Sequence, residues 1–140
     1  MANIIDLIPQ RAPIVMVDEF LGIEQSVSKS SLTVREDNIF VDDATLSECG
    51  LIEHIAQSAA ARVGYIFNSL NRPIPIGYIG AVNDFAISAH PKVGDTICTT
   101  IEVIQEVFNI TLIRAVCMVN DAEIATCKMK IFLDTDEAKS

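Results

Sequence analysis

The longest apolar stretch of this chain is GLIEHIAQSAAA, residues 50–61, and it contains a single carboxylate, Glu53. An ionised carboxylate among leucine, isoleucine and alanine is costly to desolvate unless it is paired, neutralised or directed into a cavity. As a helix, this region places polar groups and small residues on one stripe: Glu53, Gln57, Ala60, Ala61 and Gly64. Such a stripe suits close approach by a sheet or a ligand. Glu53 is therefore a candidate functional residue; the alternative is a structural carboxylate bonded to backbone amides near Gly80.

The same stretch predicts the main helix of the fold. Ser47 suits its N-cap, Glu48 is favourable in its first turn, and the helix should run to about Asn68, before a break at residues 71–73. Gly64 lies inside this helix at a cost in helix stability, which argues for a packing reason.

The regions on either side of the helix read as strands. Before it, the pattern predicts a short buried strand at residues 14–17, strands at about 20–27 and 29–35, and an acidic loop at 36–46. After it come strands at 76–88 (bent near Gly80 or Asn83), 96–106, 107–119 and 123–133. One long helix followed by a meander favours an α+β fold in which an antiparallel sheet curls around the helix. We expect one domain over residues 1–140, with 134–140 as a tail.

The composition narrows the classes of function. A net charge of −9 disfavours nucleic acid and anionic membranes as partners, and no stretch approaches the ~20 apolar residues of a membrane helix. The N-terminus lacks the pattern of a signal peptide, so we expect a cytoplasmic protein. Half of the residues are hydrophobic, which favours burial against a partner subunit in a homodimer or higher homo-oligomer. The four cysteines read as reduced core thiols, and we expect no metal site and no cofactor.

Three motifs carry a family resemblance that covers nearly the whole chain. Residues 7–18, LIPQRAPIVMVD, resemble an opening of the form L-x-P-H-R-x-P followed by apolar residues and Asp. Residues 53–57, EHIAQ, resemble the helix motif E-x-x-A-Q, and residues 91–95, PKVGD, are similar to a V-x-P-G-D turn. With these motifs the sequence resembles the 3-hydroxyacyl-acyl-carrier-protein dehydratases, whose hot-dog fold wraps a curved antiparallel sheet around one central helix.

In those enzymes a histidine before the helix and an acid within it act across a dimer interface. The resemblance implies that the histidine removes the proton α to the thioester carbonyl while the acid assists loss of the 3-hydroxyl. Glu53 matches the family acid and Gln57 its glutamine. Gly50 is a candidate amide donor at the start of the helix, and Gly80 is a further candidate for substrate binding.

The sequence departs from this family at the histidine. The family segment G-H-F-P-G is absent, and FVDDATL, residues 40–46, occupies the region. This places Asp43 near the family histidine, as a second catalytic candidate. Gln10 replaces the histidine of the opening motif.

Two histidines are present elsewhere, His54 and His90. His54 points about 100° away from Glu53 on a helix, so the two residues form no dyad on one face. We expect His54 to be partly exposed or to cap a contact at the interface, with pairing across a dimer as the alternative, and His90 to be a surface residue.

Three functions remain open. The leading hypothesis is a dehydratase-like protein acting on 3-hydroxyacyl or 2-enoyl thioesters of acyl carrier protein, in fatty-acid or related lipid or polyene biosynthesis, with atypical catalysis or none. The second is a thioesterase for acyl-coenzyme A or acyl carrier protein, in which Glu53 or Asp43 activates water. The third is a non-catalytic acyl-binding partner that forms a heterodimer with a competent, related dehydratase. Because acyl carrier protein is acidic like this chain, docking needs a local basic patch, with candidates Arg62, Arg72, Lys92 and Lys128.

Overall fold

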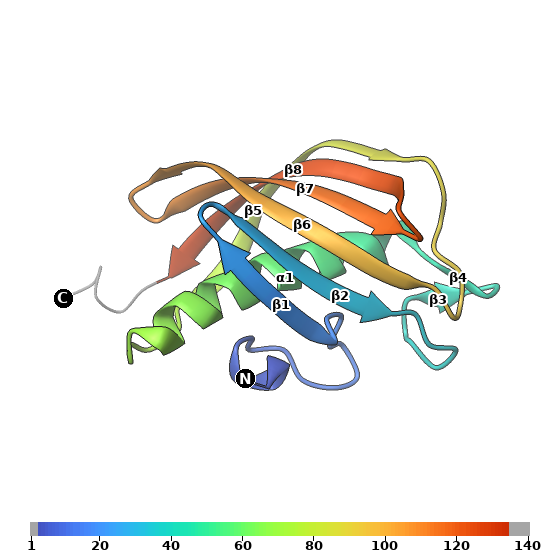
Figure 1. Ribbon diagram of the computed structural model, residues 1–140, viewed down its shortest axis with the longest axis horizontal. Coiled ribbons are helices and arrows are strands. Elements are labelled where there is room, and N and C mark those ends of the chain that lie inside the picture. Colours follow the sequence, from blue (N-terminus) through green and yellow to red (C-terminus); the bar gives the residue numbers. More distant parts are fainter. Residues whose placement is uncertain (1–2, 135–140) are drawn as a thin grey trace.

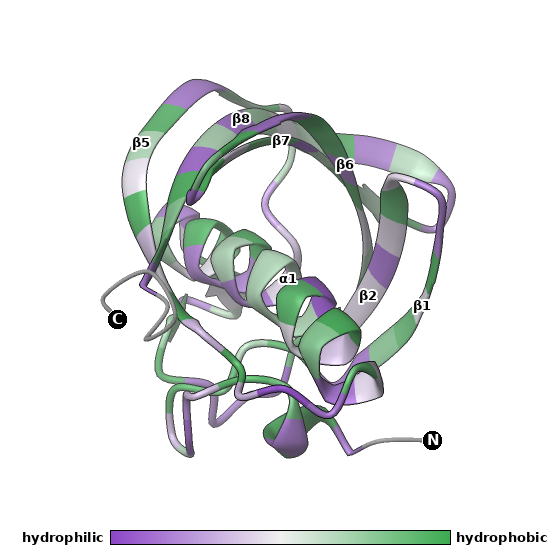
Figure 2. Ribbon diagram, turned by 90° about the vertical axis from the view of Figure 1, so that its left-hand side faces the viewer, coloured by the Kyte–Doolittle hydropathy of each residue, from purple (hydrophilic) through white to green (hydrophobic). Residues whose placement is uncertain are grey.

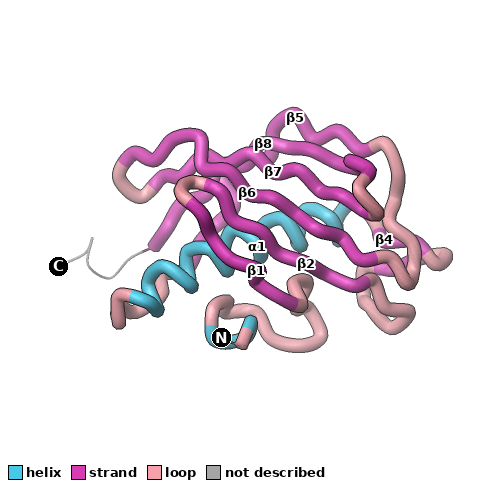
Figure 3. The backbone as a smooth tube through the Cα atoms, in the orientation of Figure 1, coloured by secondary structure: helices cyan, strands magenta, loops and turns pink. Residues whose placement is uncertain are grey.

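The computed structural model describes residues 3–134 and shows one long helix held in a curved sheet (Figures 1 and 3). Along the chain the elements are η1 (Ile4–Asp6), β1 (Glu19–Glu24), β2 (Val27–Thr33), β3 (Val41–Asp42), β4 (Thr45–Leu46), α1 (Glu48–Ser69), β5 (Ile76–Ile87), β6 (Thr96–Val107), β7 (Ile110–Val119) and β8 (Ala122–Asp134). Asp134, the first residue of the expected tail, ends β8, and residues 135–140 lie outside the described part of the chain.

The main sheet has six antiparallel strands in the order β1-β2-β6-β7-β8-β5, and β3 and β4 form a separate hairpin. Figure 2 shows the sheet arching around α1, with the N-terminal segment on the opposite side of the helix from β7 and β8. The α+β expectation of a sheet curled around one helix is confirmed. In this order β1 and β5 are the two edge strands, so each presents unpaired backbone groups on one side.

The helix begins and ends close to where local signals predict. Ser47 is its N-cap, and the Ser47 side chain accepts a hydrogen bond from the Gly50 amide at 3.2 Å. Its buried face includes Leu51, Ile55 and Ala59, which pack against inward residues of the sheet. No helix within residues 3–134 is both long enough and apolar enough to cross a membrane.

The core lies between α1 and the concave face of the sheet. Alternate residues of β6, β7 and β8 point into it, among them Ile97, Ile101, Ile113, Ala115, Met129 and Ile131. All four cysteines are free thiols, as expected, and Cys117 and Cys127 are buried. Cys98 is half-buried, whereas Cys49 is exposed in the first turn of α1, so the description as core thiols is wrong for Cys49.

The strand predicted at residues 14–17 is absent. Met16 and Val17 are buried as expected, but the segment is extended without strand pairing. Its backbone groups bond to side chains of α1 instead: Ile14 and Met16 contact Gln57, and Met16 also contacts His54. Side chains of the helix thus replace the neighbouring strand that an isolated apolar run would require.

The structure shifts the expected start of one strand, adds a hairpin within the acidic loop, and bends β5. The first hairpin turns at Gln25, which has a positive φ of 56°, so β2 starts at Val27 rather than near residue 29. The acidic loop at 36–46 contains the β3–β4 hairpin, turned by Asp43 and Ala44 with φ of 55° and 64°. The predicted bend of β5 is confirmed, because the pairing register with β8 shifts around Gly80 and again after Asn83.

Candidate functional site

A groove of about 250 Å³ runs between α1 and the edge strand β5. The helix contributes a row of small side chains that starts at Glu53. Strands β5 and β8 form the opposite wall, and the segment before β1 closes one side. The lining residues are Pro9, Gln10, Glu53, Ala56, Ala59, Ala60, Val63, Gly77, Tyr78, Ile79, Ile131 and Leu133. A narrow groove lined mainly by alanine and aliphatic side chains is a suitable surface for an alkyl chain.

Polar groups are few in this groove. Glu53 is partly buried, and its carboxylate lies among the apolar lining. Gln10 contributes a buried Oε1 atom that has no hydrogen-bond partner within residues 3–134. Tyr78 of β5 is also among the lining residues, but its side chain is on the outer face of the sheet with Phe132, its partner in the β5–β8 register. A buried carboxamide oxygen without a partner is costly, and a ligand in the groove would reach this screened atom only after the Gln10 side chain turned.

The predicted stripe on α1 divides into two faces. Glu53 and Ala60 line the groove, whereas Gln57, Ala61 and Gly64 face the N-terminal segment. A methyl group on Gly64 would overlap the carbonyl oxygen of Leu7, which is the packing reason expected for a glycine inside the helix.

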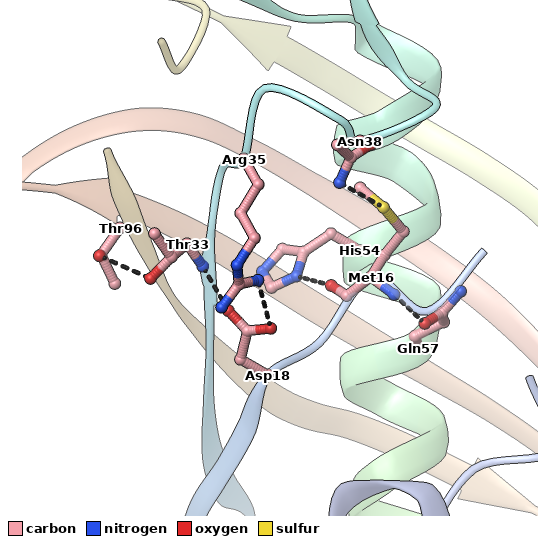
Figure 4. A network of polar contacts seen from close by, with 8 residues as sticks. All are labelled: Met16, Asp18, Thr33, Arg35, Asn38, His54, Gln57 and Thr96. Atoms are coloured by element: carbon pink, nitrogen blue, oxygen red, sulfur yellow. Dashed lines mark hydrogen bonds and ion pairs between the residues drawn. The ribbon is translucent and has the colours of Figure 1, made fainter. Parts of the chain in front are cut away.

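Gln57 is therefore a positioning residue and does not line the groove. It is fully buried, and its Oε1 accepts the Met16 N–H at 2.6 Å (Figure 4). Its Nε2 donates to the Ile14 carbonyl at 2.7 Å. Arg11 adds hydrogen bonds from Nη1 to the carbonyls of Ile8 and Gln10. These contacts hold the segment that places Gln10 in the groove.

His54 is fully buried, so the expectation of a partly exposed or interfacial residue is wrong. Its Nδ1 lies 2.7 Å from the Met16 carbonyl oxygen and its Nε2 lies 2.7 Å from the Thr99 hydroxyl, as Figure 4 shows for the first contact. Because a carbonyl only accepts, Nδ1 carries the proton and Nε2 accepts from Thr99. Burial lowers the pKa of His54 to about 4, so the ring is neutral near pH 7.

The network continues into the sheet. Thr99 Oγ1 and Cys117 Sγ are 3.3 Å apart, and burial raises the pKa of the Cys117 thiol to about 11. This chain of neutral groups links the N-terminal segment, α1, β6 and β7. The location of His54 between two bonded partners gives it no access to the groove.

The other sequence-derived candidates lie outside the groove lining. Asp43 is exposed at the tip of the β3–β4 turn, so the structure does not bring it together with Glu53. Gly50 is buried at the start of α1 and its amide already donates to Ser47. Their catalytic and binding roles stay predictions.

The surroundings of Gly80 and His90 give each of them a structural role. A methyl group on Gly80 would overlap the ring of Phe132, so this glycine allows an aromatic ring to pack across the bend of β5. Its role in substrate binding also stays a prediction. His90 is exposed, as expected, and its Nδ1 lies 3.0 Å from the Leu46 carbonyl oxygen near the start of α1.

Sequence reasoning missed Gln10 and Tyr78 as groove residues. A signal for Gln10 existed, because it occupies the histidine position of the opening motif. Tyr78 had none, since only the pairing of β5 with β8 brings this end of the strand beside α1. Within residues 3–134, no three His, Cys, Asp or Glu side chains gather to hold a metal ion.

A single long helix enclosed by a curved antiparallel sheet, with a groove along an edge strand, defines the hot-dog class of proteins. The family model for ApeP-like proteins, described as ApeP dehydratase, matches residues 2–140. The chain belongs to this family of hot-dog dehydratase-like proteins. Among curated proteins, none matches the sequence.

Solved structures share the fold at low sequence identity. The dehydratase heterocomplex ApeI:P from Xenorhabdus doucetiae is similar over 98% of this chain and 94% of that chain, with a TM-score of 0.90 and 12% identity. Cj0977, a virulence protein of Campylobacter jejuni, gives a TM-score of 0.70 over 91% and 82% of the two chains, with 14% identity. The Streptococcus mutans protein smu.793, bound to acetyl coenzyme A, gives 0.66 over 83% and 87%, with 9% identity. The family supports a dehydratase-like function, and the solved structures show the hot-dog fold.

Proposed function

We propose that this protein acts on 3-hydroxyacyl or 2-enoyl thioesters, presented by acyl carrier protein or coenzyme A, as a subunit of a hot-dog dehydratase. The observation that carries this proposal is that Glu53 and Gln10 both line an apolar groove, and that Gln10 Oε1 has no hydrogen-bond partner within residues 3–134. The alkyl chain would lie along Ala56, Ala60 and Val63, and the polar end of the substrate would lie near Glu53.

The proposed reaction removes one proton and one hydroxyl group. A base takes the proton on the carbon α to the thioester carbonyl, and the electron pair forms the 2,3 double bond as the 3-hydroxyl leaves as water. Glu53 assists departure of that hydroxyl by proton donation. After its side chain turned, Gln10 would hold the substrate by accepting a hydrogen bond through its Oε1 atom.

Within residues 3–134, the groove lining includes no histidine that could act as the base. His54 is buried and bonded on both ring nitrogens, and His90 lies near Leu46 at the start of α1. Strand β5 is an unpaired edge that also lines the groove, so a second subunit pairing along β5 would bring its own residues to the mouth of the groove. We propose that the base comes from this second subunit, a related dehydratase in a heterodimer or a second copy of this chain. The X. doucetiae neighbour is itself a heterocomplex.

A thioesterase is the second candidate, because a lone carboxylate in the groove can activate water without a histidine. A non-catalytic acyl-binding subunit is the third, since the groove lining in the described part of the chain includes one carboxylate and no histidine. A cytoplasmic location would suit all three.

Hydration of 2-enoyl thioesters, measured for the chain alone and mixed with the related dehydratase subunit, tests the proposal. Glu53→Gln should lower the rate of the competent assembly by roughly 100-fold or more, the size of a general-acid contribution. Glu48→Gln, which alters an exposed acid in the first turn of the same helix, is the matched control. Release of free thiol would favour the thioesterase, and acyl binding with neither reaction would favour the non-catalytic subunit. Full activity of Glu53→Gln would exclude the proposed role.

A further inference from the structure

Six polar side chains lie in one strip of the interior, where α1 packs against β2 and β6; Figure 2 shows β2 beside the helix. We call these residues the polar seam: His54, Ser58 and Arg62 on α1, Ser28 and Ser30 on β2, and Thr99 on β6. All six are buried, and the most exposed of them is Arg62 at 9%. Arg62 is thus unsuited to the basic docking surface expected from the sequence.

Contacts and strand register bring these residues together. His54 Nε2 lies 2.7 Å from Thr99 Oγ1, and Thr99 is directly opposite Ser30 in the β2–β6 pairing. Because α1 and β6 run in the same direction (Figure 1), positions along the two elements stay in step. Four helix residues advance about 6 Å and two strand residues advance roughly 6.6 Å. Ser58, one helical turn after His54, is therefore level with Ser28, the next inward residue of β2.

Four side chains of the polar seam have a buried polar atom without a hydrogen-bond partner among residues 3–134. These atoms are Ser28 Oγ, Ser30 Oγ, Ser58 Oγ and Arg62 Nε. An unsatisfied buried polar atom is destabilising, and buried polar groups are normally hydrogen-bonded to protein or to ordered water. Four such atoms in one strip of the interior therefore indicate that small molecules bind between α1 and β2.

The polar seam belongs to neither apolar cluster of the interior. The main core includes Ile55 and Ile101, whereas a smaller cluster joins Leu7, Phe20 and Ala61 on the side of the N-terminal segment. Hydroxyl groups and a guanidinium need hydrogen-bond partners, which an apolar molecule does not offer. The ligand of the polar seam must therefore be small and polar.

Water suits the polar seam better than an inorganic anion. Each serine hydroxyl both donates and accepts hydrogen bonds, as water does, whereas an anion only accepts. The charge of Arg62 is already attracted by Glu106 of β6, which opposes the lowering of the Arg62 pKa by burial. In a chain with a net charge of −9, a further buried anion would be poorly compensated.

We propose that the polar seam is a binding site for ordered water molecules, which hydrogen-bond to the three serine hydroxyls and to Arg62 Nε and bridge α1 to β2. Such bridges are nearly as favourable as direct hydrogen bonds, so they attach β2 to the helix where no direct polar contact does. Ser58 and Ala60 point about 160° apart on α1, so this site is separate from the groove and does not depend on the proposed reaction.

The sign of the change in melting temperature tests this proposal. Removing a hydroxyl that holds water destabilises the protein, whereas removing an unsatisfied hydroxyl from a dry interior stabilises it. We expect Ser28→Ala and Ser30→Ala each to lower the melting temperature by about 2–4 °C. Ser31→Ala, at a half-buried position on the outer face of the same strand, is the control and should change it by less than about 1 °C.

A double variant tests whether the water is shared between β2 and α1. Ser28→Ala combined with Ser58→Ala should lower the melting temperature by less than the sum of the single changes, because both substitutions remove partners of the same water molecules. The helix propensity of alanine at position 58 is present with and without Ser28→Ala, so it cancels in this comparison.

A high-resolution crystal structure of the parent protein is the direct test. It should show water density about 2.5–3.2 Å from the serine Oγ atoms of the polar seam, and crystals soaked in bromide should show no anomalous peak there. Any of four results would overturn the inference: an interior without density beside these serines, a bromide peak in place of water, a higher melting temperature for both Ser28→Ala and Ser30→Ala, or strictly additive changes in the double variant.

Discussion

Gln57 holds the backbone of Met16 across 41 residues of sequence, with its Oε1 accepting the Met16 N–H at 2.6 Å. The opposite end of the same carboxamide donates to Ile14, so one side chain satisfies two backbone groups that have no strand partner. This segment continues from Gln10. The two hydrogen bonds of Gln57, on one face of α1, therefore help to position Gln10 in the groove on another face.

Gln57→Ala should destabilise the protein strongly. It leaves the buried Met16 N–H without a partner, which costs about 1–3 kcal/mol, whereas water can reach the part-buried Ile14 carbonyl, so we expect a loss of roughly 1–3 kcal/mol. Urea unfolding measures this change. Gln105→Ala, at an exposed position of β6, is the control and should change the free energy of unfolding by less than about 0.5 kcal/mol. Equal stability of the two variants would contradict a stabilising role for the hydrogen bonds of Gln57 to Met16 and Ile14.

Lowering the pH should reduce the free energy of unfolding, because His54 is neutral in the folded protein. Its folded pKa, about 4, is below the ordinary value of 6.5, so between these values the unfolded state binds more protons. The contribution of neutral His54 is therefore complete above pH 6.5 and is lost as the pH falls toward 4. We expect the free energy of unfolding to drop by about 2 kcal/mol between pH 7 and pH 5, and by about 3 kcal/mol at pH 4.

Urea unfolding at a series of pH values checks this dependence. His90→Gln should retain the slope between pH 5 and 7, because His90 is exposed. His54→Gln should remove most of it, whatever its effect on absolute stability. A parent protein with constant stability from pH 7 to 5 would be inconsistent with a buried, neutral His54.

Ala60→Leu should shorten the acyl chain that the groove accepts. Ala60 lies in the row of small helix residues along the groove, so a larger side chain removes space without altering Glu53. We expect binding of the longest acyl chains to weaken by about tenfold while the shortest are unaffected, since a few methylenes are worth about 1–3 kcal/mol. Binding of acyl thioesters of graded length measures this, and Ala89→Leu, in an exposed loop, is the control. Uniform weakening at every chain length would argue against an acyl groove.

Lys128→Glu should stabilise the isolated chain. The substitution converts a like-charge pair with Arg114 into an opposite-charge pair, and cross-strand pairs of this kind contribute about 0.2–1 kcal/mol. Chemical denaturation at low salt should show the gain, and added salt should reduce it. The same substitution at Lys29, which is opposite Thr100, has no such pair to improve. A loss of stability for Lys128→Glu would show that the two cations do not repel in the folded chain.

The elements themselves follow from local sequence. Ser47 predicts the start of α1 because an N-cap hydroxyl satisfies a free amide within the next turn. The alternation along β6, β7 and β8 predicts which residues enter the core, since strand side chains alternate between faces. These signals depend on neighbours a few residues apart, and they suffice for an antiparallel sheet curled around one helix and for naming Glu53 as a candidate.

Only the tertiary structure decided the surroundings of the site. Gln57 and Glu53 are a helical turn apart, yet one bonds to the N-terminal segment and the other lines the groove, because long-range packing assigns each side of α1 a different neighbour. The register of the sheet likewise places Arg114 of β7 between Glu102 of β6 and Lys128 of β8. Such pairings are set by contacts between residues distant in the chain, which local periodicity does not encode.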